Sequence, residues 1–107
     1  MNKSKVLNLL GLAKRAKKII IGSDSIEKAL QSKTAVMVFV GKDSSQNTID
    51  KFNKKCFYYN VPLDLSFDSV EIGRAIGKPN AKTIALCDQG FKESIVKIIK
   101  DGDLNES

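Results

Sequence analysis

The chain passes from a strand-like run into a helix-like run at Ile19-Ile20-Ile21-Gly22-Ser23-Asp24-Ser25-Ile26-Glu27-Lys28. The three β-branched residues predict a short strand that Gly22 ends, and Ser23 or Asp24 is a suitable N-cap for the helix that follows. A helix N-terminus presents free backbone N–H groups and the positive end of the helix dipole, which favour an anion. An ordinary capped helix is the alternative interpretation.

The alternation of strand and helix patterns continues on both sides of this junction. Apolar residues at spacings of three and four predict helices over 3–17, from 24 onward, and over 45–59, 69–76 and 89–100. Short apolar runs predict strands over 19–21, 35–40, 63–67 and 83–87. Strands separated by helices predict one α/β domain over residues 1–107, an α/β/α sandwich with a core over about 3–100 and a polar, frayed tail over 101–107.

Composition excludes several classes of function. Hydrophobic residues make up 42% of 107 residues, enough for a core, and no apolar run reaches the roughly 18 residues of a membrane span. There is no histidine, so zinc sites and imidazole-based catalysis lose their commonest component. Cys56 and Cys87 form no paired motif, which is typical of a reducing compartment. We expect a cytoplasmic protein that binds no metal, cofactor, membrane or small-molecule substrate and is not an enzyme.

The positive charge is concentrated in one part of the chain. The net charge is +6, and residues 1–33 carry eight basic and two acidic groups, while the rest of the chain holds ten of each. A localised positive field is expected for a protein that binds a polyanion. A solvated face that keeps the protein soluble is the equally acceptable alternative.

Much of that charge lies in Lys14-Arg15-Ala16-Lys17-Lys18, at the end of the first predicted helix. Cations at a helix C-terminus interact favourably with its dipole, which accounts for one or two of the four. The others indicate phosphate contacts or a solvated face. Lys28, one turn into the second helix, can reach a phosphate backbone bound at Gly22.

Two further motifs have an ordinary structural explanation. Ile72-Gly73-Arg74-Ala75-Ile76-Gly77-Lys78 does not have the GxGxxG spacing of a dinucleotide loop, and it predicts a short helix that stops at Gly77. The loop 78–82 follows this helix and can touch a ligand. Tyr58 and Tyr59 lie beside lysines and could stack on bases, although tyrosines in such a position more often close the edge of a core.

Three stretches resemble the kink-turn-binding ribosomal-protein family, and most closely its bacterial YlxQ branch. They are Asn8-Leu9-Leu10-Gly11-Leu12-Ala13-Lys14-Arg15-Ala16, Tyr58-Tyr59-Asn60-Val61-Pro62 and the glycine-containing motif at 72–78. The resemblance covers about residues 3–100. It implies a three-layer α/β/α sandwich with a mixed four-stranded sheet, and RNA binding without catalysis to kink-turns or related internal loops with sheared G·A pairs.

The family's RNA motif, Gly-Thr-Asn-Glu-x-x-Lys, is only partly matched. Gly22 and Lys28 agree, and Ser23 keeps the hydroxyl of the Thr. Asp24 and Ser25 replace the Asn and Glu that read the sheared guanines, and they lack the amide donor and the reach of those side chains. The resemblance therefore implies docking of the RNA backbone. It also leaves open a ribosome-assembly or protein-interaction adaptor that has lost base-specific readout.

Three smaller features complete the comparison with the family. Lys17 stands where the branch usually has Gly, and Ser69 stands where a lysine is common. The family's second contact surface corresponds to the loop 78–82.

An enzyme fragment, as when this fold is appended to RNA methyltransferases, is a third hypothesis, but no cofactor-binding domain follows in this sequence.

The sequence thus predicts a monomeric RNA-binding protein, linked to the ribosome or translation within a ribonucleoprotein. Its partner would be a structured RNA, including ribosomal RNA. The predicted RNA-binding residues are Lys14, Arg15, Lys17, Lys18, Gly22, Ser23, Asp24, Ser25, Lys28, Lys78, Asn80 and Lys82.

Overall fold

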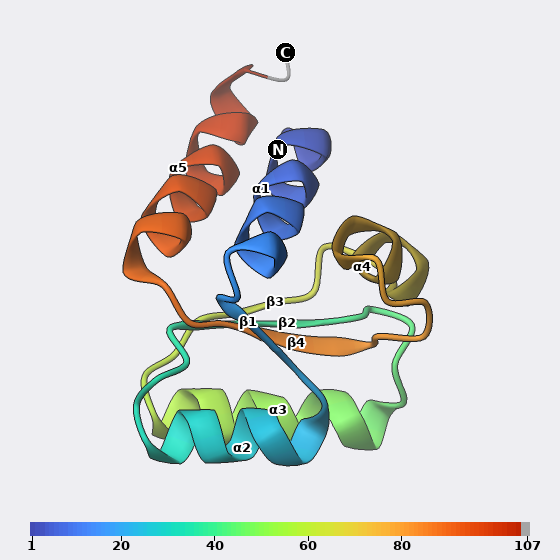
Figure 1. Cartoon of the computed structure of the whole chain (residues 1–107), viewed down its shortest axis with the longest axis vertical. Helices are drawn as coiled ribbons and strands as arrows, with labels where there is room; N and C mark the ends of the chain where they lie inside the picture. The colour runs from blue at the N-terminus through green and yellow to red at the C-terminus, as the bar shows by residue number, and fades with distance from the viewer. Residues whose placement is uncertain (106–107) are drawn as a thin grey trace.

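The protein is a three-layer α/β/α sandwich in which helices cover both faces of one sheet (Figure 1). The computed structural model describes the fold of residues 1–105 and the side-chain environment of residues 1–101. Helices α1, α4 and α5 lie on one face, and α2 and α3 lie on the other. In chain order the elements are α1 (Lys3–Arg15), β1 (Ile19–Ile21), α2 (Ser23–Gln31), β2 (Met37–Val40), α3 (Gln46–Tyr58), β3 (Leu63–Asp64), α4 (Ser69–Ile76), β4 (Thr83–Leu86) and α5 (Gln89–Asn105).

The sheet is mixed, as the resemblance implied, with the strand order β1-β4-β2-β3. Strand β4 pairs antiparallel with both β1 and β2, while β3 pairs parallel with β2. Every residue of the two central strands is buried, because helices cover both of their faces. The edge strands are the shortest, with three residues in β1 and two in β3.

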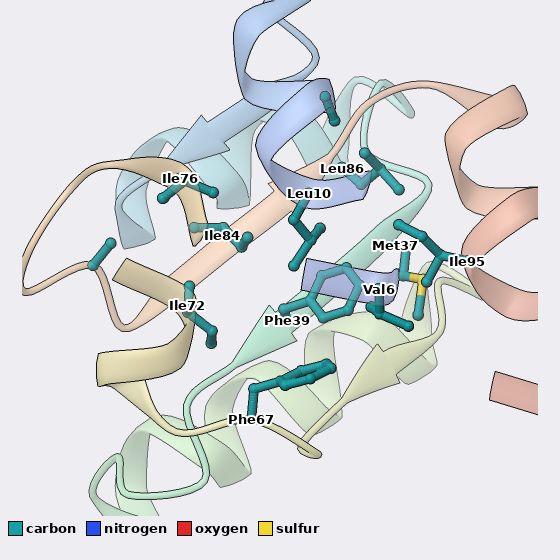
Figure 2. Close-up of a cluster of buried hydrophobic side chains, with 12 residues drawn as sticks. Val6, Leu10, Met37, Phe39, Phe67, Ile72, Ile76, Ile84, Leu86 and Ile95 are labelled. Carbon is teal, nitrogen blue, oxygen red and sulfur yellow. The ribbon is translucent and has the colours of Figure 1, made fainter. Parts of the chain in front are cut away.

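Each face of the sheet has its own hydrophobic core. On one face, Phe39 and Ile84 pack against side chains of α1, α4 and α5, together with Phe67 (Figure 2). On the other, Val38 and Ala85 pack against α2 and α3 through Ile26 and other side chains. Adjacent strand residues thus point to opposite layers, as the period of two along a strand requires.

Several element boundaries differ from the sequence prediction, including the start of β2 at Met37 rather than at residue 35. Strand β3 ends at Asp64 because the Asp64 carboxylate accepts hydrogen bonds from the Ser66 N–H at 3.0 Å and the Ser66 hydroxyl at 2.9 Å, which turns the chain. Helix α1 ends at Arg15, and the chain leaves it through Lys17 with a φ of 63°. Helix α5 continues past Lys100 to Asn105, since the polar tail contains no proline. Residues 106–107 of the predicted tail lie outside the described residues.

Close packing around α4 depends on two glycines. A Cβ at Gly73 would lie 2.8 Å from the carbonyl oxygen of Lys78, so this glycine lets the following loop fold back on the helix. A Cβ at Gly11 would lie 2.9 Å from the carbonyl oxygen of Ala75, so α1 and α4 also approach closely. Gly77 ends α4, as predicted, and it does so in the left-handed conformation with a φ of 69°. Within residues 1–105, no helix is long and apolar enough to cross a membrane.

Candidate nucleic-acid interface

The N-terminus of α2 (residues 22–25) lies where the sequence predicted an anion site, but its cap differs from the prediction. The N-cap is Gly22, with φ 99° and ψ 140°, and Ser23 is already the first helical residue. No side chain accepts a hydrogen bond from this first turn. Gly22 adopts a backbone conformation that side-chain-bearing residues avoid, and the helix starts one residue earlier than a Ser23 cap would place it and two earlier than an Asp24 cap would. The space beside the Gly22 Cα is open to 4 Å.

The other helices of the described region all have a side-chain cap. Asn2 accepts from the Lys5 N–H in α1, and Ser45 from the Thr48 N–H in α3. Asp68 forms a full capping box in α4, and the Asp88 carboxylate accepts from the Phe91 N–H at 2.9 Å in α5. Within residues 1–105, only α2 therefore presents a first turn whose N–H groups are left for another partner.

The sheet register places the loop 78–82 at the same end of the sheet as Gly22. Ile21 pairs with Ile84, so Gly22 continues β1 alongside the residues that precede β4. At the end of β2, the Gly41 N–H donates to the Lys82 carbonyl oxygen at 2.7 Å. Lys78, Asn80 and Lys82 are exposed at this end. The structure thus brings together at one end of the sheet two segments that are about 60 residues apart in the sequence.

A hollow of about 470 Å³ opens between α4 and this loop. Its lining combines apolar, polar and positively charged side chains, and Val70, one of the lining residues, is 62% exposed. The lining residues are Ser69, Val70, Gly73, Arg74, Gly77, Pro79, Asn80 and Lys82. Arg74 was not predicted as a site residue. The available signal was a cation in the last turn of a short helix, which the helix dipole explains equally well.

The carboxylate of Asp43 is held at the start of α4. It accepts hydrogen bonds from the Ser69 hydroxyl at 2.6 Å and from the Ser69 N–H at 2.9 Å. These two donors, the hydroxyl first, hold the pKa of Asp43 below its usual value, with Lys82 contributing a weaker attraction. Ser69 therefore binds an acid at the position where the family commonly has a lysine. Both oxygens of the Asp43 carboxylate therefore accept hydrogen bonds from within the protein.

The basic run (Lys14, Arg15, Lys17 and Lys18) lies at the opposite end of β1. The Lys18 carbonyl oxygen accepts from the Cys87 N–H at 2.8 Å, beyond the Ile19–Leu86 pair. Four residue steps of about 3.3 Å separate Lys18 from Gly22, which gives roughly 13 Å. The predicted site residues therefore form two groups, one at each end of β1. All of them are exposed except Lys14 and Ser23, which are half-buried.

The two tyrosines have different roles. Tyr59 packs against the core under α2 and α3, which fits the structural interpretation. Tyr58 is 77% exposed, and the two rings meet edge to face with centroids 4.8 Å apart. The nearby lysines Lys51 and Lys55 both pair with Glu27, at 3.0 Å and 3.3 Å. The single carboxylate of Glu27 thus offsets part of the positive charge on α3.

With this fold and this charged sheet end established, the chain can be assigned to a family. It belongs to the Ribosomal protein L7Ae/L30e/S12e/Gadd45 family, whose model matches residues 4–98. The resemblance to this family is therefore confirmed.

The similar proteins cover most of the chain. The RNA-binding protein YlxQ of Bacillus subtilis is 37% identical over 91 residues, which is 85% of this chain and 91% of that protein. The RNA-binding protein YlxQ of Enterococcus faecium is 38% identical over 99 residues, which is 92% of this chain and 95% of its own.

Two solved structures have the same fold. A protein of unknown function from Bacillus halodurans superposes with a TM-score of 0.86 at 33% identity, covering 90% of this chain and 97% of the other. The 15.5 kD RNA-binding protein of Giardia lamblia superposes with a TM-score of 0.77 at 17% identity, covering 94% of this chain and 88% of the other. The second likeness concerns the fold alone.

Proposed function

We propose that the protein binds RNA without catalysing a reaction, and that it recognises a kink-turn or a related internal loop. The observation that carries this proposal is the α2 N-terminus, the one helix start among residues 1–105 without a side-chain cap. Its N–H groups and dipole attract a phosphate, and Gly22 leaves room for a nucleic-acid backbone to approach. We further propose that the protein acts as a cytoplasmic monomer within a ribonucleoprotein linked to the ribosome or translation.

Two further observations support the same site, and the names of two similar proteins support RNA binding. Lys28 is exposed one turn into α2, and the loop 78–82 places Lys78, Asn80 and Lys82 at the same end of the sheet. A bent RNA could therefore contact the α2 N-terminus and the loop at once. The two YlxQ proteins to which this chain is similar are named as RNA-binding.

Asp24 and Ser25 determine how specific the binding can be. Asp24 lies in the first turn of α2, where its carboxylate interacts favourably with the helix dipole but repels phosphate. Ser25 is exposed and short, so it reaches less far towards a base than glutamate would. Backbone docking through Gly22, Ser23 and Lys28 remains available. The second candidate function, an adaptor without base-specific readout, rests on these two side chains.

A comparison of two RNAs tests the proposal. Affinity is measured for a kink-turn RNA and for the same RNA with its tandem G·A pairs replaced by Watson–Crick pairs. We expect the intact kink-turn to bind at least tenfold more tightly. Equal affinity for both would favour the adaptor and contradict kink-turn recognition.

A charge-matched pair of variants then tests the site itself. Lys28→Ala should weaken binding to both RNAs and reduce the slope of log affinity against log salt by about 0.7 to 0.9. Lys97→Ala, which removes an exposed lysine from α5 on the other face of the sheet, should change neither quantity. Identical behaviour of the two variants would remove Lys28 from the interface.

A further inference from the structure

The chain contains only two arginines, Arg15 and Arg74, and both line the same groove. This groove, called the arginine groove below, runs between α1 and α4, which lie side by side (Figure 1). It has a volume of about 450 Å³, and its other lining residues are Leu7, Asn8, Gly11, Glu71 and Ala75. Gly11 allows α1 to approach the Ala75 carbonyl oxygen, so the helix contact itself forms the apolar floor.

The guanidinium groups in this groove are free to bind an anion. Within residues 1–101, neither Arg15 nor Arg74 has an ion pair or a side-chain hydrogen bond, and both side chains are exposed. The acid in the groove is already engaged, because Glu71 accepts from the Asp68 N–H at 3.0 Å and pairs with Lys3 at 3.5 Å. A planar guanidinium can bind a phosphate through two parallel hydrogen bonds in a fixed fork, whereas a lysine ammonium acts as a point charge.

Arg74 also connects the two groups of predicted RNA-binding residues. It lines the hollow that contains Asn80 and Lys82, and on its other side it lines the groove that contains Arg15 of the basic run. Positive groups therefore continue from the loop 78–82 across α4 to the C-terminus of α1. A charged surface of this shape fits a continuous polyanion better than an isolated small ion.

We propose that the arginine groove binds the phosphodiester backbone of an RNA helix that extends away from the α2 N-terminus, with Arg15 and Arg74 on the same strand. This inference rests on the proposed function and extends it, because it adds Arg74 and the α1–α4 surface to the interface. The basic run lies about 13 Å from Gly22 along β1, and in this arrangement it would contact the same RNA. An acidic protein segment is the competing occupant.

The test uses two kink-turn RNAs, one with long flanking helices and one trimmed to the kink. Arg15→Ala and Arg74→Ala should each weaken binding of the long RNA about three- to tenfold and reduce its salt slope by about 0.7 to 0.9. The trimmed RNA should lose much less affinity. Arg74→Lys should keep the salt slope and recover only part of the affinity, because it keeps the charge and loses the planar fork. Lys97→Ala serves as the control.

The outcomes separate this inference from the proposed function. If the wild-type protein binds the kink-turn and both arginine variants behave like Lys97→Ala, the groove is not an RNA site. If broken G·A pairs make no difference but both arginine variants weaken RNA binding, the groove is supported while kink recognition fails. No retention of either RNA at low salt overturns both. Arginine-dependent binding of a polyglutamate peptide more tightly than the long RNA also overturns the groove proposal, in favour of a protein partner.

Discussion

Helices α2 and α4 both begin at the same end of the sheet, but side chains cap only the N-terminus of α4. At α4 the Asp68 carboxylate accepts from the Glu71 N–H at 2.8 Å, and Asp43 accepts from the Ser69 N–H. At α2 the N-cap is a glycine, and no side chain caps the first turn. A cap contributes typically about 1 kcal/mol to stability. A glycine N-cap gives up only about a few tenths of a kcal/mol relative to such a side chain, and the α2 N-terminus that it leaves uncapped is where we propose that RNA docks.

The largest effect is expected from Gly22→Val. A β-branched residue at a φ of 99° is strained by about 1 to 3 kcal/mol, and its side chain would fill the space beside the α2 N-terminus. We expect both a lower free energy of unfolding in urea and at least a tenfold loss of RNA affinity. Gly77→Asn is a control for stability, since asparagine tolerates the φ of 69° there. Wild-type RNA affinity in Gly22→Val would show that the RNA docks elsewhere.

The next effect is the contrast between Asp68→Ala and Ser23→Ala. Asp68→Ala removes the capping box of α4 and should lower the free energy of unfolding by about 1 kcal/mol, with RNA affinity unchanged. Ser23→Ala should cost less than about 0.5 kcal/mol, because the Ser23 side chain makes no cap bond. Denaturant titrations of both variants measure the difference. Equal losses would contradict the distinction between the two helix starts.

Asp24→Asn should move stability and RNA binding in opposite directions. Loss of the carboxylate from the first turn of α2 weakens its interaction with the helix dipole by about 0.3 to 1 kcal/mol. The same change removes repulsion from phosphate, so RNA affinity should rise several-fold at low salt. Thermal unfolding and a salt series of RNA titrations measure the two effects. Weaker RNA binding would instead mean that the Asp24 carboxylate accepts a hydrogen bond from the RNA.

The smallest effect concerns the pH dependence at the start of α4. Hydrogen bonds from Ser69 hold the pKa of Asp43 below its usual 3.8, so the folded state favours the charged carboxylate. The resulting stability is fully present above that usual value and is lost as the pH falls through the lower folded pKa. An NMR titration of the Asp43 carboxyl should show the lowered pKa, and Ser69→Ala should raise it. Titration at the usual value in the wild type would contradict the hydrogen bonds at α4.

The layers of the fold were predictable because they depend on local periodicity. The patterns over 3–17 and 35–40 correctly predicted helix α1 and the buried strand β2, which contribute Val6, Leu10 and Phe39 to the core. The ends of β3 and α5 were not predicted, because Asp64 forms a turn with its own neighbours and a polar composition alone does not end a helix. The strand order could not be read at all, since pairing between β1 and β4 joins segments more than 60 residues apart.

In the candidate site, too, local patterns could be predicted from the sequence, while contacts between distant segments could not. The junction from Gly22 to Lys28 was found because its motif is continuous in the sequence, although the cap residue was misplaced by the left-handed φ of Gly22. The engagement of Asp43 by Ser69 spans 26 residues, and no local pattern signals it. Arg74 was read as an ordinary residue of a short helix, because only the packing of α1 on α4 brings it beside Arg15.

The lengths of the outer strands have a consequence for behaviour at high concentration. A sheet grows into a fibril by adding new chains to the unpaired N–H and C=O groups of its edges. Here those edges are β1 with three residues and β3 with two, while the longer and fully buried strands lie in the middle. An incoming chain would find only a few backbone groups to pair with. The shortness of both edges thereby disfavours amyloid-like polymerisation, and in β3 the charge of Asp64 adds to this protection.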